Sequence, residues 1–360
     1  METLEYKANA SDVLDRLTAM YERRTPDRIL ASTAVPSPTL SRYRAENAEG
    51  FCDYVEPEAR VRFWDALLAE RRDLEDDSLP VAYLSEMDQG LYGGMVGGQI
   101  QYMNDPATGW ISSMVPPLLD DLAEMPGLCA DETGPAFERF LRQIDVFVQA
   151  GRGRFGVSHF ILINGLNFVF ELVGATRTYE ALADAPDLVR RAVDFAFELN
   201  LKVQETYFER AWQIGGGTFS NMAQWLPGRI ISESVDPFHM TSVEYFEEWG
   251  REAVERILAR FDGGVMHVHG NGRHLLEAVA SVRGLKALFL GDDTGFPTAF
   301  DALHEIRART GDLPLVLAAP YEPFAHRLDQ GDLPGGVFYL VSDVPGVDEA
   351  NRLMEKVRAY

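Results

Sequence analysis

The most constraining feature of this 360-residue sequence is a regular alternation of short apolar runs with longer amphipathic runs after residue 130. The short runs have the length of β-strands, as in "FGVSHFILI", "GGVMHVH", "LKALFLG", "LPLVLAA" and "GVFYLVS". Runs with helical spacing, such as "SVEYFEEWGREAVERILARF", separate them. At least six βα units can be counted, and "PVAYL" and "QIQYM" can supply the remaining strands of eight. We therefore predict an α/β fold, an eight-stranded (β/α) TIM barrel.

The N-terminal part of the chain has a different pattern. "SDVLDRLTAMYERR" and "EPEARVRFWDALLAERRDLEDD" have helical spacing, and the Pro/Ser-containing stretch "TAVPSPTLS" between them is typical of a loop. We expect residues 1–75 to form a helical N-terminal cap of the same domain and residues 76–360 to form the barrel.

Charge and cysteine content exclude several classes of partner. A formal net charge of −23 repels phosphate backbones and anionic lipid headgroups, so we expect neither nucleic-acid nor membrane binding. It also disfavours polyanionic substrates. Cys52 and Cys129 are far apart and outside any C-x-x-C spacing, and "METLEYKANA" lacks the features of a signal peptide. These features are typical of a reduced cytoplasmic protein.

One segment, 155–175, is apolar enough to resemble a membrane span. His159, Asn164, Asn167 and Glu171 interrupt it, and each would need a polar partner inside lipid. We expect a buried strand that runs into a helix instead.

Candidate functional residues follow the strands, because the chemistry of a βα barrel lies where strands end and helices begin. Imidazoles, carboxylates and other polar groups recur at these points. They are Asn167, Asp236, His239, His267, His269, Asp292, Tyr321 and Asp343.

The pair His267 and His269 carries the strongest signal. Side chains alternate along a strand, so both rings lie on one face and both can reach one ion. A carboxylate such as Asp343 or Asp293 can complete a set of two imidazoles and one carboxylate with an open position, as a catalytic divalent metal requires. The alternative is that the two rings are hydrogen-bonded lining residues without a metal.

The remaining candidates have roles around that ion. Asp236 and His239 are candidates for positioning a substrate or shuttling a proton, although Asp236 precedes a proline and is equally compatible with a turn. Asp292 lies in a Gly-Asp-Asp turn and is a candidate substrate contact. Asn167, Trp225 and Tyr321 are expected to line the substrate pocket. No G-x-S-x-G motif is present and neither cysteine has a motif around it, so covalent catalysis by Ser or Cys is not supported.

Residues from about 150 to 358 resemble the uroporphyrinogen decarboxylase superfamily, which includes the corrinoid:coenzyme M methyltransferases. The resemblance rests on the order and spacing of "VSHFILINGLNFVFELVGATRTYEALADAPDLV", "SESVDPFHMTSVEYFEEW", "GGVMHVHGNGRHLLEAVASVRGLKALFLGDD" and "DEANRLMEKV". It implies an eight-stranded βα barrel with its cleft at the carboxyl ends of the strands.

The resemblance also implies a chemistry. The methyltransferase branch binds zinc through a His-x-Cys pair and a later Cys, and the zinc activates a thiol that exchanges a methyl group with a corrinoid. The matching positions here are His267 and His269, with Asp343 near the last. Imidazole and carboxylate in place of both thiolates favour an oxygen nucleophile or a different metal. The arginine-rich N-terminal motif of the decarboxylase branch is missing.

The function that the sequence favours is metal-assisted methyl transfer to or from a small nucleophile or a corrinoid, with zinc as the expected ion and a corrinoid protein as a candidate partner. A metal-free decarboxylase of uroporphyrinogen-like or smaller carboxylated substrates is one alternative, which a basic patch at the cleft mouth would support. A non-catalytic ligand-binding barrel is the other, and it is favoured if the strand-end carboxylates point away from the histidines.

Overall fold

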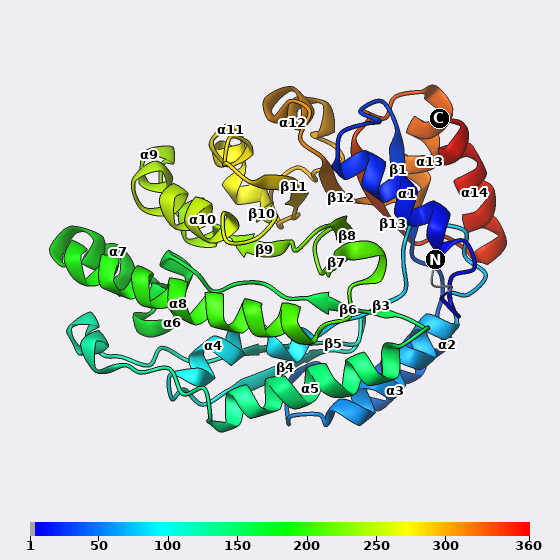
Figure 1. The fold of residues 1–360 in the computed structure, drawn as a ribbon. Helices are drawn as coiled ribbons and strands as arrows, with labels where there is room; N and C mark the ends of the chain where they lie inside the picture. Colours follow the sequence, from blue (N-terminus) through cyan, green and yellow to red (C-terminus); the bar gives the residue numbers. More distant parts are fainter. Residues whose placement is uncertain (1–3) are drawn as a thin grey trace.

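A six-stranded parallel sheet forms the centre of the computed structural model, which describes residues 4–360 (Figure 1). Every pair of neighbouring strands in it is parallel. In spatial order the strands are β1 (Ile29–Thr33), β13 (Val337–Ser342), β12 (Leu315–Pro320), β11 (Leu285–Leu290), β10 (Gly264–Val268) and β9 (Ile231–Ser234).

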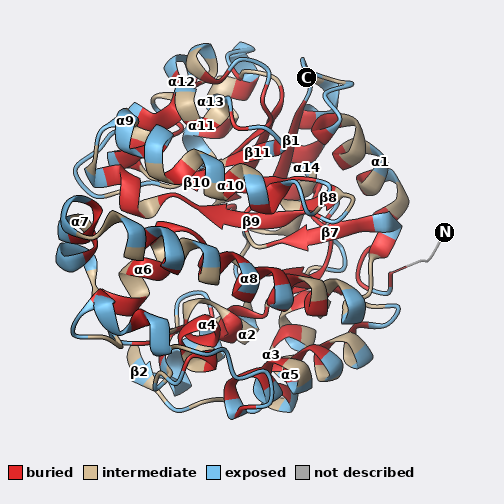
Figure 2. Ribbon diagram, turned by 60° about the vertical axis from the view of Figure 1, so that its left-hand side comes forward, coloured by how far each residue is buried: buried red, intermediate tan, exposed pale blue. Residues whose placement is uncertain are grey.

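Helices follow these strands along the chain, as the alternating sequence pattern predicts. The helices after β9 to β13 are α9 (Val243–Tyr245), α10 (Arg251–Leu258), α11 (Leu276–Ala280), α12 (Leu303–Thr310), α13 (Tyr321–Gln330) and α14 (Val347–Ala359). A π-helical turn, Phe246–Gly250, joins α9 to α10. Figure 2 shows that the strands are buried and that the helices turn their buried sides toward them.

A second sheet extends the arrangement. It contains β3 (Val81–Ala82), β6 (Gly156–His159), β7 (Gly217–Ser220) and β8 (Gln224–Pro227), of which β7 and β8 form an antiparallel hairpin. A single parallel bridge between Ile161 and Ser232 connects the end of β6 to β9. On the other side, the Asp77 N–H donates to the Ala31 carbonyl of β1 at 2.8 Å. These links do not amount to a closed barrel among residues 4–360, so the structure shows a mixed α/β fold and not the TIM barrel itself.

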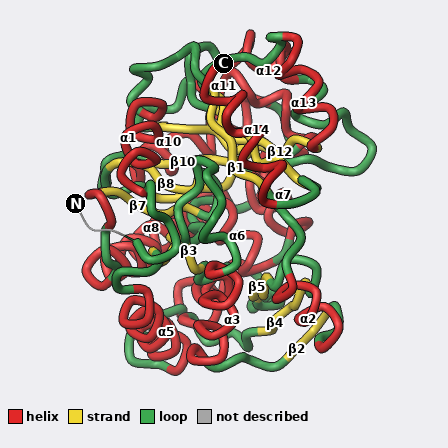
Figure 3. Tube along the Cα trace, turned by 90° about the vertical axis from the view of Figure 1, so that its right-hand side faces the viewer, coloured by secondary structure: helices red, strands yellow, loops and turns green. Residues whose placement is uncertain are grey.

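The expectation that "QIQYM" supplies a barrel strand is wrong. This segment is β4 (Gln101–Asp105), which pairs antiparallel with β2 (Gly50–Cys52) and β5 (Trp110–Met114). Figure 3 shows this small sheet apart from the main one. The preceding glycine-rich run forms α4 (Gln89–Met95), which packs on β5 so tightly that a Cβ at Gly90 would lie 2.6 Å from the Ser113 Oγ. The chain then returns through a Pro- and Gly-containing turn, which favours a hairpin.

The first 75 residues contribute two strands, β1 and β2, as well as helices. The helices are α1 (Ala10–Tyr21), α2 (Pro38–Glu46) and α3 (Pro57–Ala69). The stretch expected as a loop contains the start of α2, whose Ser37 Oγ caps the helix by accepting from the Leu40 N–H at 3.0 Å. The segment Ile29–Thr33, which no pattern singles out, is β1, and all five of its residues are buried in the main sheet.

The remaining long helices lie between β5 and β7 in the sequence. They are α5 (Pro135–Gly151), α6 (Leu166–Val173), α7 (Ala175–Asp184) and α8 (Pro186–Arg210). The apolar segment 155–175 therefore forms a buried strand and a short helix, as expected. Within residues 4–360, no helix has both the length and the apolar character that crossing a membrane requires.

The two faces of the main sheet pack against different cores. One face packs under the helices. On the other, Leu30, Val265, Ala287, Val316 and Phe338 belong to one buried cluster. Side chains of α1 and of the β7–β8 hairpin complete this inner cluster at the amino ends of the strands. Because side chains alternate, residues two and four positions after these five point to the same inner side.

A buried carboxylate ties the N-terminal segment to the sheet. Asp76 has no exposed side-chain surface, and it accepts from Lys7 Nζ (2.9 Å), an Arg71 guanidinium N–H (2.9 Å), the Thr33 N–H at the end of β1 (2.9 Å) and the Ser78 hydroxyl (2.7 Å). Removing one partner of such a network leaves the other charges buried and unpaired.

We expect Asp76→Ala to lower the free energy of unfolding by about 3–5 kcal/mol, measured by urea denaturation. The matched control is Asp312→Ala, which removes an ion pair to Arg23 from a carboxylate that is 70% exposed and should cost less than about 1 kcal/mol. Equal losses for the two variants would show that the buried network does not stabilise the fold.

Candidate metal centre

His267 and His269 lie at the carboxyl end of β10, on the inner side of the sheet. His267 pairs in register with Ser234 of β9, and its side chain is 9% exposed. The two rings are perpendicular, with centroids 4.9 Å apart. The strand alternation therefore places both imidazoles together, as expected from the H-x-H spacing.

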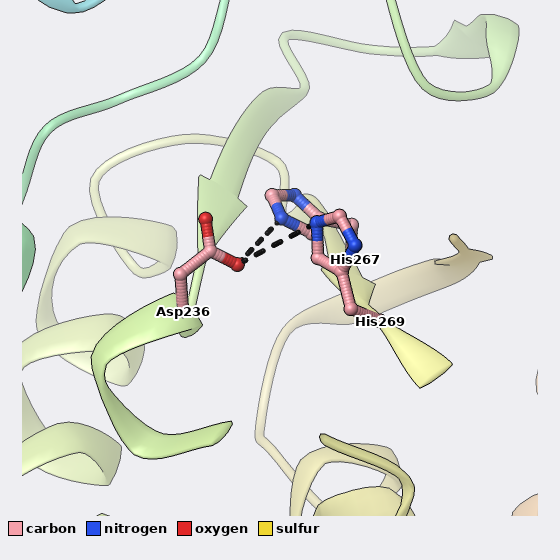
Figure 4. Close-up of side chains that lie close together, drawn as sticks. All are labelled: Asp236, His267 and His269. Atoms are coloured by element: carbon pink, nitrogen blue, oxygen red, sulfur yellow. Dashed lines mark hydrogen bonds and ion pairs between the residues drawn. The ribbon is translucent and has the colours of Figure 1, made fainter. Parts of the chain in front are cut away.

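Asp236 supplies a carboxylate to this pair (Figure 4). It follows β9 directly, and its Oδ1 lies 2.8 Å from His267 Nε2 and 3.9 Å from His269 Nε2. One ligand atom from each of the three residues lies within 4.8 Å of the others, so the group can hold a metal ion. Ion–ligand distances of about 2.1 Å put the ligands of a tetrahedral zinc about 3.4 Å apart. The observed distances lie on both sides of that value, so small side-chain rotations suffice.

A second carboxylate orients the outer histidine. His269 Nδ1 lies 3.1 Å from Asp293 Oδ1, and the other oxygen of Asp293 accepts the Asn271 N–H at 3.0 Å. Gly291 leaves space for the ring, because a Cβ there would lie 3.1 Å from His269 Nδ1. Fixing Nδ1 in this way directs Nε2 toward Asp236, which is how ligating histidines are commonly held. Both carboxylates thus point toward the histidines, the opposite of what a non-catalytic barrel predicts.

The histidines control the ionisation of both carboxylates. Burial alone would raise the pKa of Asp236, but the hydrogen bond from His267 and the charges of His267 and His239 hold it well below its usual value. For Asp293, the Asn271 N–H and then the charge of His269 lower the pKa. Both groups are therefore carboxylates at neutral pH, the form that binds a cation.

His239 lies against the same group from the turn after β9. Its Nδ1 is 3.6 Å from Asp236 Oδ1, and its ring centroid is 5.5 Å from that of His269. Burial lowers the pKa of His239 to about 4, so the ring is neutral at pH 7. Its Nε2 is buried and has no hydrogen-bond partner in residues 4–360. Gly272 makes room for it, since a Cβ there would approach the ring to 2.2 Å.

Two acids that the sequence analysis did not select lie near this group. Asp88 precedes α4, and its Oδ1 is buried without a hydrogen-bond partner among the described residues. Burial raises the pKa of Asp88 to about 7, and the charges of His267 and Asp236 also act on it. Burial likewise raises the pKa of Glu171 in α6 to about 7, with Asp88 as a further cause. The sequence feature that could have identified this pair is Glu171, the one acid in the apolar run "LNFVFELV".

Two other predicted site residues border the cluster. Asn167 Nδ2 donates to the Ser234 carbonyl at 2.8 Å, next to the turn that carries Asp236. Asp292 accepts the Ala299 N–H at 2.6 Å and lies 3.6 Å from an Arg273 guanidinium nitrogen. Asp292 therefore holds the loop after β11.

Three predicted site residues lie elsewhere. Trp225 is 1% exposed in the inner cluster, and its Nε1 donates to the Ile214 carbonyl at 2.9 Å. The Tyr321 hydroxyl donates to Glu349 of α14 at 2.7 Å. Asp343 follows β13, accepts from the Ser342 hydroxyl at 2.8 Å, and is not part of the histidine cluster. Of the carboxylates near the histidines, Asp236 lies close to both rings and Asp293 contacts His269 alone.

The fold as a whole is similar to that of a solved methyltransferase from Methanosarcina mazei. The TM-score is 0.61, and the likeness covers 96% of this chain and 98% of that chain at 13% sequence identity. At this identity the comparison shows a shared fold. No protein-family model and no curated protein matches the sequence.

The raised pKa of Asp88 predicts a specific pH dependence of stability. An acid whose pKa is higher in the folded than in the unfolded state contributes stability below about pH 4, and that contribution is lost as the pH rises through about 7. Asp88→Asn removes this loss. We expect the variant to gain on the order of 2 kcal/mol relative to the wild type between pH 5 and pH 8, measured by urea denaturation in EDTA.

Glu171→Gln should behave in the same direction, because burial raises the pKa of that carboxyl too. Asp120→Asn is the control, since that side chain is fully exposed. If the Asp88→Asn and wild-type stabilities run parallel from pH 5 to pH 8, the carboxyl is not neutral in the folded protein.

Proposed function

We propose that this chain is a methyltransferase of the uroporphyrinogen decarboxylase superfamily, in which a divalent ion assists methyl transfer to or from a small nucleophile. The observation that carries the proposal is the convergence of Asp236, His267 and His269 at the carboxyl strand ends. The shared fold with a methyltransferase supports the reaction class. We also propose that β3 and β6 complete an eight-stranded barrel with the main sheet, which the bridge between Ile161 and Ser232 supports.

The donor set suits the proposed ion. Two imidazole nitrogens and one carboxylate oxygen leave an open position, as in catalytic zinc sites. An ion bound there would supply a Lewis acid that lowers the pKa of a bound nucleophile. With no thiolate among the donors, the site is harder than the His/Cys site that the family resemblance implies, so an oxygen nucleophile is favoured.

The chain's own residues hold and deprotonate the reacting molecule. Asp236 is ionised, and its Oδ1 lies 2.8 Å from His267 Nε2, so the two atoms face the same point and would both contact the ion. Asp293 fixes the ring of His269. His239 is neutral and has a free ring nitrogen beside the cluster, so it is placed to take up a proton from a nucleophile or return one to a leaving group.

The family resemblance supplies the rest of the proposed reaction. Only the family resemblance supports zinc as the ion and a corrinoid on a partner protein as the methyl carrier. A small-molecule substrate fits the acidic chain better than a polyanion, given the net charge of −23.

Metal-free decarboxylation is the second candidate, and one observation favours it. Asp88 and Glu171 have pKa values raised to about 7 by burial, so either can donate the proton that a decarboxylated carbanion needs. Arg273 beside the cluster does not supply a free basic group, because its guanidinium already lies 3.6 Å from Asp292.

Metal content separates the two candidates. Protein purified without an affinity tag should contain, or accept, about one zinc, cobalt, nickel or iron ion per chain, measured by elemental analysis. The double variant His267→Ala, His269→Ala should lose it. His304→Ala is the control, because that imidazole is 59% exposed and pairs with Asp332. A wild-type protein that cannot be loaded with any of the four metals would overturn the proposal.

Affinity measurements on single variants identify the carboxylates. Asp293→Asn should weaken zinc binding by about 10–100-fold, as expected for a group that orients a ligating histidine, and Asp236→Asn should weaken it at least as much. Asp343→Asn should leave it unchanged if Asp236 is the ligand. The reverse order for Asp236 and Asp343 would assign the ligand to the last strand instead.

The reaction itself can be followed with methylcobalamin as methyl donor. The zinc-loaded chain with small alcohols or thiols as acceptors should demethylate it, seen as loss of the methyl–cobalt absorbance. The rate should fall to background in the double histidine variant. Equal rates in the two proteins would show that His267 and His269 take no part in the reaction.

A further inference from the structure

A cavity of about 680 Å³ lies beside the candidate metal centre, between the carboxyl ends of β1, β12 and β13 and the helix α3. This volume falls within the range of about 300–1,000 Å³ that small-molecule sites occupy. Its lining does not include Asp236, His267 or His269, so it is a compartment separate from the ligand atoms.

The sheet register connects this compartment to the histidines. Ser32, Leu340 and Ala318 line the cavity and stand opposite one another on β1, β13 and β12. Continuing the register by one residue from the last pairs of β10, β11 and β12 aligns Ala318 with Gly291 and His269. Two strand spacings, about 10 Å, therefore separate His269 from the cavity floor.

Nothing larger than a methyl group stands on the sheet between the two. Gly291 has no side chain, and Ala318 is exposed although it lies within a strand of the central sheet. Its neighbours Leu317 and Ala319, which point to the helix side, are buried. The inner face of the sheet is therefore open at Ala318, on the row of residues that leads to His269.

The cavity has no free positive charge to offer a ligand. Glu70 and Arg71 are its charged lining residues within 4–360. Glu70 accepts hydrogen bonds from Ser37 and Thr39, and Arg71 pairs with Asp76 at 2.9 Å. The wall is aromatic and aliphatic: Trp64 and Tyr83 meet edge to face at 5.3 Å. An anionic ligand would lose its hydration here without gaining a partner.

Two buried polar atoms on the lining residues lack partners. Trp64 is 4% exposed, and its Nε1 has no hydrogen-bond acceptor among the described residues. The Oε1 of Gln224 is buried and has no donor there either. Gln224 adopts φ 62°, a conformation that costs an ordinary L-residue about 1 kcal/mol or more. An unpaired indole donor and an unpaired amide acceptor together match a group that both accepts and donates, such as a hydroxyl.

We propose that this cavity binds the body of the substrate, and that the substrate is an uncharged, ring-bearing molecule with a hydroxyl or similar group that pairs with Trp64 and Gln224. The assignment of this molecule as the substrate rests on the proposed function: the end opposite the hydroxyl would point toward His269, which that function makes a ligand of the reacting ion. This substrate class differs from the anionic tetrapyrroles and the thiols that the family resemblance implies.

The test uses 2-naphthol as the probe, since it is uncharged at pH 7, about the length of the open floor, and carries one hydroxyl. Isothermal titration calorimetry on the full chain should show a single site. Ala318→Phe, which fills the floor, should weaken binding at least tenfold. Gln224→Met, which keeps the side-chain shape and removes the acceptor, should weaken it about 3–10-fold. 2-Naphthoate, with the same rings and a negative charge, should bind at least tenfold more weakly than 2-naphthol.

The control variant is Ala183→Phe, an alanine exposed on α7 away from the cavity, which should leave binding unchanged. No binding of 2-naphthol, equal binding by Ala318→Phe, or equal binding of the carboxylate would each overturn the inference. Zinc titration of the same samples keeps the two proposals apart. If the protein binds zinc but not 2-naphthol, the cavity assignment alone is wrong. If 2-naphthol binds as expected but zinc does not, the metal-assisted function alone is wrong.

Discussion

The contact between the Asp236 carboxylate and the His267 imidazole depends on the parallel course of β9 and β10. Parallel neighbours end at the same edge of a sheet, so the turn after β9 delivers Asp236 beside the histidine that β10 carries. The same rule brings Asp293 to His269 from the loop after β11. Three consecutive strands thereby assemble a donor set and its support without any long-range loop. An antiparallel sheet would send these turns to opposite edges.

Burial gives the acids around this edge different charges. Asp236 and Asp293 are held as carboxylates by imidazoles and a backbone N–H, whereas burial outweighs the Gln89 N–H and the His267 charge at Asp88, and the pKa values of Asp88 and Glu171 rise to about 7. This edge of the sheet therefore combines ionised carboxylates that can bind a cation with acids that are partly protonated at neutral pH and can donate a proton. Pairs of titratable groups that are pushed apart in this way are typical of catalytic sites.

The periodic signal predicted the repeating part of the fold and little of what departs from it. Every βα unit from β9 to α14 lies where the apolar runs predicted it, because local alternation determines such units. β1 is followed by the Pro/Ser-containing stretch expected as a loop, so its helix was not predicted and only its pairing with β13 identifies the strand. "QIQYM" has strand propensity, but propensity does not specify a partner, and its hairpin turn directs it to a separate sheet.

Part of the candidate site could likewise be predicted from the sequence, and part required the fold. His267 and His269 could be paired from sequence because two residues of one strand share a face by geometry alone. Choosing Asp236 over Asp343 as their carboxylate required knowing that β9 and not β13 borders β10. Trp64 and Gln224 could not be selected from sequence, since they come from a helix and a hairpin far apart in the chain. What marks them is an unmet hydrogen bond in an apolar cavity, and such a deficit exists only once the chain has folded.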